Sequence, residues 1–312
     1  MANTTLGVNI DADSVIEQFQ KEQRVDVPTK KTQFSEKNYL QARLLPNETS
    51  KTLIIRLLPF SPEGGIPFKK VWIHTVKVDK EVSPGGWRTF VCPIRNGFDD
   101  KCPFCETSKK ARELMNNASS NAEKDKFSEV EYMNRVKEAW IARVIERGHE
   151  EDGPKFWLFN NSRKKDGPYD KIMNLYMQRY NAAKAKGKIN NIFDVNDGKD
   201  LILTLSKDSN NKTVIQITDD DEKSPLSEDY DTANAWINND KKWNEVYVAK
   251  PYEYTSIIVS GGVPVWDKEK KGWVDKEEAK KAQKEAEIKE LEENLTEKSN
   301  DFSSFINDEI KF

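Results

Sequence analysis

The sequence predicts a mixed, mainly β fold with a metal-binding segment inserted into it, helices at its periphery and an arm at each end. Runs rich in β-branched and aromatic residues recur between positions 52 and 266, separated by turns that contain Gly and Pro. All three cysteines lie in one stretch, "VCPIRNGFDDKCPFCET". Both ends are strongly polar, in a chain that is 33% charged with a mean hydropathy of -0.81. At 312 residues the chain can bury a core without a metal ion.

The first segment, residues 1–45, is expected to form an arm. Val15, Ile16 and Phe19 follow the capping residues Asp13 and Ser14 at helical spacing. This apolar face is too small to stabilise a helix by itself, so it needs a partner surface. We therefore expect the arm to dock on another surface.

Residues 46–265 are expected to form the core, and the part at about 69–118, which contains the cysteines, is expected to form a subdomain of it. The expected strands are 52–60, 69–78, 87–92, 138–147, 155–160, 200–206 and 213–218, and the expected helices are 104–117 and 169–186. The stretch "YTSIIVSGGVPVW" is predicted to close the β core. Residues 266–298 are predicted to be a charged helical segment, and residues 299–312 an acidic, disordered tail.

The cysteine spacing predicts a metal site. Two residues separate Cys102 from Cys105, which allows both sulfur atoms to face one ion, and Cys92 lies upstream beyond a Gly-containing loop. The fourth ligand must be His74, which lies on a predicted strand, or His149, which lies in a turn rich in carboxylates. We predict that His74, Cys92, Cys102 and Cys105 bind one structural zinc ion, because four protein ligands leave no position for a substrate.

Three other interpretations of the cysteines are weaker. A buried cysteine pair with an unrelated third thiol needs no metal. A catalytic Cys–His pair is disfavoured because no nucleophile motif surrounds the cysteines, and a redox CxxC motif because a βαβ context is missing.

Together with their neighbours, these residues resemble the single-stranded DNA-binding (helix-destabilising) protein family of T-even bacteriophages. The resemblance lies in a strand histidine followed by Cys-x9-Cys-x2-Cys, in "LIIRLLP" upstream, and in "AWIARVIER" and "YDKI" downstream. It covers about residues 53–217. The chain departs from the family in a longer gap between His74 and Cys92 and in having no Lys or Arg before Lys21.

The resemblance implies an oligonucleotide-binding (OB) β-barrel with an inserted zinc subdomain and single-stranded DNA in the cleft between them. It also implies cooperative self-association through the N-terminal arm, and recruitment of replication and recombination proteins by the acidic tail. The expected setting is the cytoplasm of an infected bacterial host. The absence of a signal peptide and of an 18-residue apolar run agrees with a chain that is not secreted.

The charge distribution is compatible with binding to a nucleic acid strand. Although the net charge is -3, residues 135–188 contain 13 Lys/Arg against 7 Asp/Glu, whereas residues 275–312 contain 7 against 12. Strand binding needs cations for phosphates and aromatic rings for bases. The candidates are Arg56, Arg135, Lys137, Trp140, Arg143, Trp157, Arg163, Lys164, Lys165, Tyr169, Lys171, Tyr176 and Arg179. A core position remains the alternative for each aromatic residue, and the resemblance favours Trp140 as a base-stacking ring and Arg56 as a cation facing the cleft.

The tail ends in "FINDEIKF", where Phe305, Ile306, Ile310 and Phe312 lie among acidic residues. The pattern resembles the acidic, Phe-terminated tip of bacterial single-strand-binding proteins, which implies a hydrophobic pocket on a replication protein as its partner. Packing on the chain's own core, or competition with DNA for the basic cleft, are the alternatives.

The expected function is sequence-nonspecific binding of single-stranded DNA in phage DNA replication, recombination and repair. The alternative is a zinc-ribbon adaptor, or transcription accessory protein, that binds other proteins. We expect no enzyme activity, because the acidic run "DDDE" at 219–222 is predicted to lie in a solvated loop and no carboxylate cluster for magnesium is recognisable.

Overall fold

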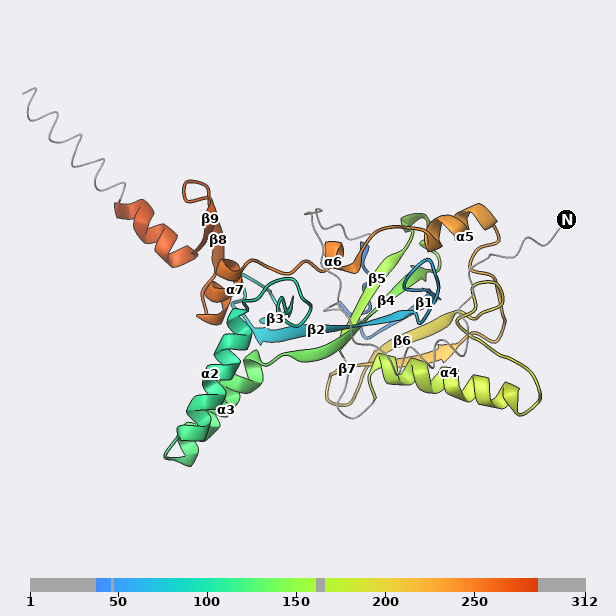
Figure 1. Cartoon of the computed structure of the whole chain (residues 1–312), viewed down its shortest axis with the longest axis horizontal. Coiled ribbons are helices and arrows are strands. Elements are labelled where there is room, and N and C mark those ends of the chain that lie inside the picture. The colour runs from blue at the N-terminus through green and yellow to red at the C-terminus, as the bar shows by residue number, and fades with distance from the viewer. Residues whose placement is uncertain (1–37, 46–47, 161–165, 286–312) are drawn as a thin grey trace, which may run out of the picture. The chain divides into compact units, whose positions relative to one another are not determined.

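The computed structural model describes residues 38–45, 48–160 and 166–285 (Figure 1). Most of the expected N-terminal arm and the whole of the expected tail lie outside these residues. The same holds for Val15, Ile16 and Phe19, for Arg163, Lys164 and Lys165, and for Phe305, Ile306, Ile310 and Phe312. The chain divides into two compact units. Within the described part, unit 1 comprises 38–73, 91–100 and 136–249, and unit 2 comprises 74–90, 101–135 and 250–285.

A seven-stranded, mainly antiparallel sheet organises the fold. Its strands are β1 (Ser50–Leu58), β2 (Phe68–Lys77), β3 (Trp87–Val91), β4 (Lys137–Glu146), β5 (Lys155–Asn160), β6 (Leu201–Lys207) and β7 (Thr213–Asp219). The order is β3-β2-β4-β1-β6-β7, and β5 pairs with β4. The mixed fold with its antiparallel sheet matches the prediction, but among the described strands the sheet does not close into the expected barrel.

Both faces of the central strands are buried. Successive residues of a strand point to opposite faces, so Trp157 and Phe159 of β5 join one core, whereas Phe156 joins the other. The first core is covered by α4 (Pro168–Lys184), which contributes Tyr169, Ile172 and Tyr176. Trp243 and Val246 of the short helix α6 (Trp243–Val246) close the second core. This double burial explains why β4 is buried from Ala139 to Ile145 and is apolar there except at Arg143.

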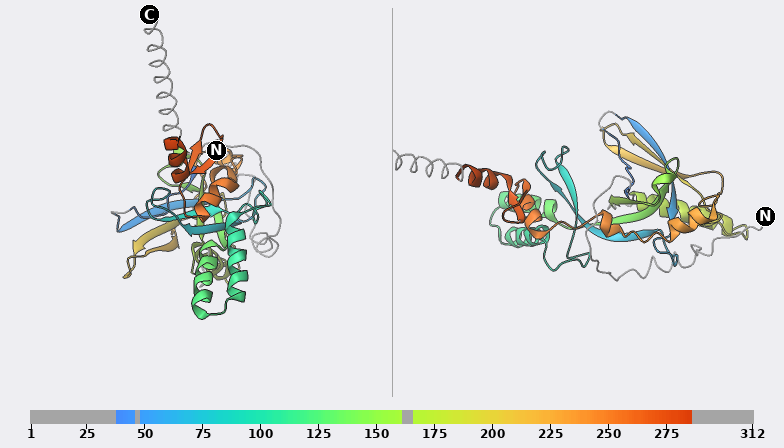
Figure 2. Two further views of the ribbon diagram at one scale, coloured as in Figure 1. Left: turned by 90° about the vertical axis from the view of Figure 1, so that its left-hand side faces the viewer. Right: turned by 90° about the horizontal axis from the view of Figure 1, so that it is seen from above.

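The remaining elements are mostly helical. Unit 1 also contains α5 (Tyr230–Ile237) and the 3-10 turn η2 (Glu150–Asp152). In unit 2, α2 (Pro103–Asn117) and α3 (Asn121–Asn134) form a helical hairpin that is seen side-on in Figure 2. Unit 2 also contains α7 (Tyr252–Val259), a hairpin of β8 (Pro264–Asp267) and β9 (Gly272–Asp275), and a helix at residues 276–285.

The predicted final core strand is wrong. The stretch 254–266 instead forms most of α7 and the start of β8, which pairs only with β9 in a separate two-stranded sheet. A short apolar run fits a buried helix as well as a strand, so tertiary packing decides between them. Here Tyr254 lies in α7, and its ring packs against Trp273 of β9, with the ring centroids 4.8 Å apart.

Candidate functional site

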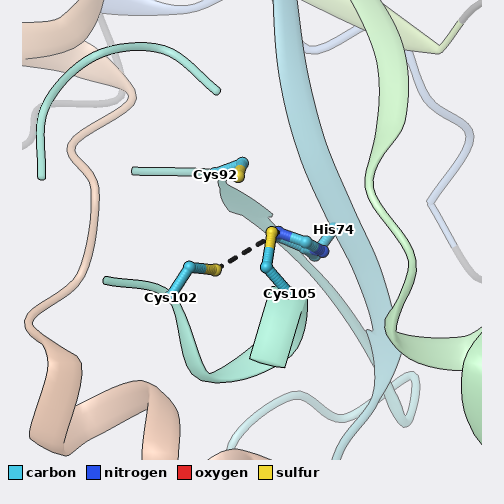
Figure 3. Close-up of side chains that lie close together, drawn as sticks. All are labelled: His74, Cys92, Cys102 and Cys105. Atoms are coloured by element: carbon cyan, nitrogen blue, oxygen red, sulfur yellow. Dashed lines mark hydrogen bonds between the residues drawn. The ribbon is translucent and has the colours of Figure 1, made fainter. Parts of the chain in front are cut away.

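The four predicted metal ligands come together in one buried group (Figure 3). His74 lies on β2, Cys92 directly follows β3, and Cys102 and Cys105 lie at the start of α2. Their ligand atoms all lie within 4.8 Å of one another. His74 Nε2 is 3.4 Å from Cys102 Sγ and 3.6 Å from Cys105 Sγ. Bonds of about 2.0–2.3 Å in a tetrahedron place ligand atoms roughly 3.5 Å apart, so this spacing suits a metal ion.

The imidazole of His74 is oriented for metal binding by α3. His74 Nδ1 is 2.8 Å from the carbonyl oxygen of Asn134, the last residue of α3. Because a carbonyl oxygen only accepts, Nδ1 must carry the proton and donate it, which leaves the lone pair of Nε2 directed at the thiols. A histidine held in this way by its second nitrogen is a usual arrangement in metal sites. The ring of Phe104, 5.0 Å away between centroids, packs against the imidazole.

The thiols of Cys102 and Cys105 lie where negative charge is favoured. Cys102 is the N-cap of α2, and Cys105 belongs to its first turn. The unpaired N–H groups and the dipole of a helix N-terminus stabilise thiolates. Cys92 Sγ accepts a hydrogen bond from the backbone N–H of Arg95, 3.5 Å away. One imidazole and three thiols can thus hold a metal ion.

A loop that starts at Cys92 is fixed on β2. The side chain of Asn96 accepts a hydrogen bond from Trp72 N–H (3.1 Å) and donates to the carbonyl oxygens of Trp72 (2.7 Å) and Cys92 (2.8 Å). Cys92 N–H also donates to Trp72 O, 2.9 Å away. The loop thereby places the exposed Arg95 guanidinium 5.9 Å from the centre of the half-buried Trp72 ring.

The second histidine lies in a different group. His149, Glu151 and Asp152 also approach one another, and the first two are exposed. None of the cysteines belongs to this group, so His74 is the histidine that accompanies them. Exposed acidic groups of this kind occur often without a metal ion.

Six of the predicted nucleic-acid contacts are buried instead. They are Arg56, Trp140, Arg143, Trp157, Tyr169 and Tyr176. The ring that the sequence favours for base stacking, Trp140, is 5% exposed and stacks on Tyr169, with the centroids 3.9 Å apart and the planes at 2°. The aromatic residues of this region belong to the core because α4 covers this face of the sheet.

The two buried arginines have structural partners. Arg56 is paired with Asp200, 3.1 Å away, and donates to Ser224 and to the carbonyl of Asp194. Burial lowers the pKa of Arg56, although Asp200 opposes this effect. Arg56 is therefore buried and paired, and the expectation that it faces a cleft is wrong. Arg143 donates to backbone carbonyls, including those of Pro59 and Trp236.

The other described candidates lie nearer the surface. Arg135 and Lys137 are half-buried at the end of α3 and the start of β4. Lys171 Nζ donates to the carbonyl of Ile215 (2.6 Å), and Arg179 pairs with Asp219 (2.6 Å). The side chain of Asp219 is only 1% exposed, so the prediction that the acidic run at 219–222 is solvated is wrong for its first residue, which ends β7.

The sequence interpretation missed the cations and the ring on β2. In "KKVW", Lys70 and Trp72 alternate, so both point to one face of β2, whereas Lys69 points to the other. Lys70 Nζ lies 5.3 Å from the Trp140 ring centre and 3.3 Å from a carboxylate oxygen of Glu138. The two-residue spacing of Lys70 and Trp72 on a predicted strand could have identified them from the sequence.

No helix in the described part of the chain is long and apolar enough to cross a membrane. Comparison with known proteins finds no matching family model and no matching curated sequence.

Proposed function

We propose that this chain binds single-stranded DNA without sequence preference and that a structural zinc ion organises part of the binding surface. The observation that carries the proposal is the loop after Cys92, which is held on β2 by Asn96 and brings Arg95 over Trp72. Single-strand binding combines cations that meet phosphates with rings on which bases stack. The side of β2 that carries Trp72, Lys70 and Arg95 provides both.

Zinc suits the donor set of His74, Cys92, Cys102 and Cys105 because imidazole and thiolates are its preferred ligands. When bound, the ion supplies folding free energy rather than chemistry, since four protein ligands complete its coordination. Cys92 is both a proposed zinc ligand and the first residue of the loop that carries Arg95. Loss of the ion should therefore also displace Arg95 from the Trp72 ring.

The proposal includes three further expectations. The open sheet acts as a variant of the OB-fold. The arm at 1–45 associates with a neighbouring copy on the strand, and the tail at 299–312 recruits replication and recombination proteins. The proposed setting is phage DNA replication, recombination and repair in the cytoplasm of the bacterial host. The proposed role is not enzymatic.

The test is a titration of tryptophan fluorescence with poly(dT) and with duplex DNA at several salt concentrations. We expect a preference for the single strand and a linear fall of log affinity with log salt, because bound cations release counterions from the strand. Trp72→Leu should weaken binding about 5- to 150-fold, corresponding to roughly 1–3 kcal/mol for one stacked base. Arg95→Ala should chiefly reduce the salt slope.

Trp266→Leu is the matched control, because Trp266 is exposed on β8 in the other unit. Its affinity should equal that of the unmodified protein. Equal affinity for duplex and single strand would contradict the proposal. Weak binding that does not respond to salt would instead support the adaptor that binds proteins.

A further inference from the structure

A pocket of about 300 Å³ lies in unit 1, on the face of β2 opposite to Lys70 and Trp72. Lys69 of β2 lines it, and consecutive strand residues point to opposite faces. The other walls come from the segment after β1 (60–62), from Arg143 of β4, from Phe156 of β5 and from residues 239–244. The pocket is therefore separate from the surface around Trp72.

The walls of this pocket carry a strong excess of positive charge. Lys69, Arg143, Lys241 and Lys242 line it, against the single carboxylate of Asp240. Lys242 is exposed and Lys69 is half-buried, whereas Lys241 donates to the side chain of Asn38. An anionic group is the ligand that this distribution favours.

Arg143 strengthens this excess. Its side chain is 3% exposed, and its guanidinium donates to the carbonyl oxygens of Pro59, Trp236, Ile237 and Asn239 at 2.8–3.4 Å. Among the described residues no carboxylate pairs with it, and its Nε lacks a hydrogen-bond partner. Burial lowers the pKa of Arg143 to about 10. Backbone dipoles compensate this buried charge only partly, so an anion in the pocket would gain from it.

Aromatic rings form the remaining walls. Phe60 is half-buried and packs on Phe156, with the centroids 6.4 Å apart, and Lys69 Nζ lies 6.0 Å from the Phe60 centre. The ring of Trp243 packs against the ring of Phe98, with the centroids 5.5 Å apart. A rigid ring next to a lysine suits a ligand that joins a planar group to an anion.

We propose that this pocket binds one nucleotide unit, with the base against Phe60 and the phosphate between Lys69 and Lys242. Its volume is at the lower end of the range for small-molecule pockets, about 300–1,000 Å³, which admits one nucleotide rather than a longer segment. The ligand chemistry is shared by a free nucleotide and by one residue of a DNA strand. The inference does not depend on strand binding at the Trp72 surface.

Calorimetric titration with dTMP, thymidine, inorganic phosphate and the oligonucleotide (dT)8 tests the proposal. We expect dTMP to bind more tightly than thymidine or phosphate alone. The double variant K69A/K242A and the single variant Phe60→Ala should each weaken dTMP binding about tenfold or more, because each removes a charged contact or a stacking surface. Lys207→Ala, an exposed lysine on β6, is the control and should bind like the unmodified protein.

The (dT)8 arm identifies the source of the nucleotide. A parallel loss of (dT)8 affinity in K69A/K242A supports a pocket that accepts one residue of a strand, and loss of dTMP alone supports a free-nucleotide pocket. Binding of dTMP no tighter than thymidine, or unchanged affinity in both pocket variants, overturns the proposal. The Trp72 surface is tested separately with the Trp72→Leu variant. If this variant binds (dT)8 as tightly as the unmodified protein, the strand does not bind at the Trp72 surface, whatever the result for the pocket.

Discussion

Both ring nitrogens of the buried His74 have partners, in contrast to the exposed side chain of His149. One ring nitrogen donates to the carbonyl of Asn134 at the end of α3, and the other faces Cys102 and Cys105. The side chain is fully buried. A neutral imidazole with a fixed tautomer is a good zinc ligand, so removal of this ring should affect the metal before it affects the rest of the fold.

We predict that His74→Ala loses most of the bound zinc, whereas His149→Ala keeps one zinc ion per chain. His149 is exposed and lies apart from the cysteines, which makes it a matched control. Elemental analysis of the two purified variants measures the outcome. Full occupancy in His74→Ala, or loss in His149→Ala, would show that the ligand set is wrong.

Asp219 shows how a buried carboxylate contributes to stability. Burial alone would raise its pKa, but hydrogen bonds and charge from Arg179, with the charge of Lys199, outweigh burial and hold the pKa of Asp219 below its ordinary value. Because the folded-state pKa is lowered, the stabilisation is present above the ordinary pKa and is lost as the pH falls through the folded-state value.

Asp219→Asn should therefore lower the free energy of unfolding by about 1–2 kcal/mol at about pH 7, a modest amount because Arg179 is half exposed. The difference from the unmodified protein should begin to shrink below about pH 4, the ordinary pKa of the carboxyl in the unfolded chain, and should disappear as the pH falls through the lowered folded-state pKa. Urea unfolding at several pH values measures it, with the exposed Asp125→Asn as a control. A difference that does not vary with pH would mean that the ion pairs are not its cause.

At the scale of elements, α3 depends on its ends rather than on burial. None of its residues is buried. Its N-terminus has a capping box, in which Ser120 accepts from the backbone of Glu123 and the Glu123 side chain accepts from the backbone of Ser120. Glu131 pairs with Arg112 of α2. Since the last residue of α3 orients His74, a loss of order in this helix should also affect the proposed metal centre.

Ser120→Ala should destabilise α3 by about 0.5–2 kcal/mol, the usual cost of losing an N-cap. Hydrogen exchange of the α3 amides should become faster by the corresponding factor. Ser128→Ala is the control, because this exposed serine lies in the interior of the helix, where alanine has the higher helix propensity. Exchange that accelerates equally in both variants would argue against a role for the cap.

At the scale of the whole molecule, the proposed metal centre and the sheet are expected to contribute different kinds of stability. The sheet buries apolar side chains on both faces, and this burial stabilises it. The group around His74 instead gathers three thiols that have little apolar surface to bury, so the binding energy of a metal ion there is folding energy.

Removal of zinc by a chelator should therefore act unevenly along the chain. We predict a large loss of hydrogen-exchange protection in α2 and in the loop after Cys92, and little change in the hairpin of β6 and β7. Readdition of zinc should restore the protection, because a ligand that binds only the folded form stabilises it. Uniform loss along the chain would mean that the metal supports the entire fold.

The sequence by itself determined the features that depend on local spacing. Strands β1 to β7 follow from alternating or β-rich runs. The approach of Cys102 and Cys105 follows from the two-residue gap between them, which allows both sulfur atoms to face one point. His74 was preferred to His149 as the fourth ligand because His74 lies on a predicted strand beside the cysteines. These predictions needed only the geometry of a few neighbouring residues.

Only the tertiary structure decided which face of each strand is covered. Trp140 and Tyr169 stack on each other because α4 packs over this face of the sheet. Arg143 donates to carbonyls at the C-terminal end of α5, nearly a hundred residues away in the sequence. The placement of Arg95 over Trp72, and the pocket beside Lys69, also arise between segments distant in sequence. Burial is a property of the packed molecule, so a strand pattern predicts the two faces but not which of them water reaches.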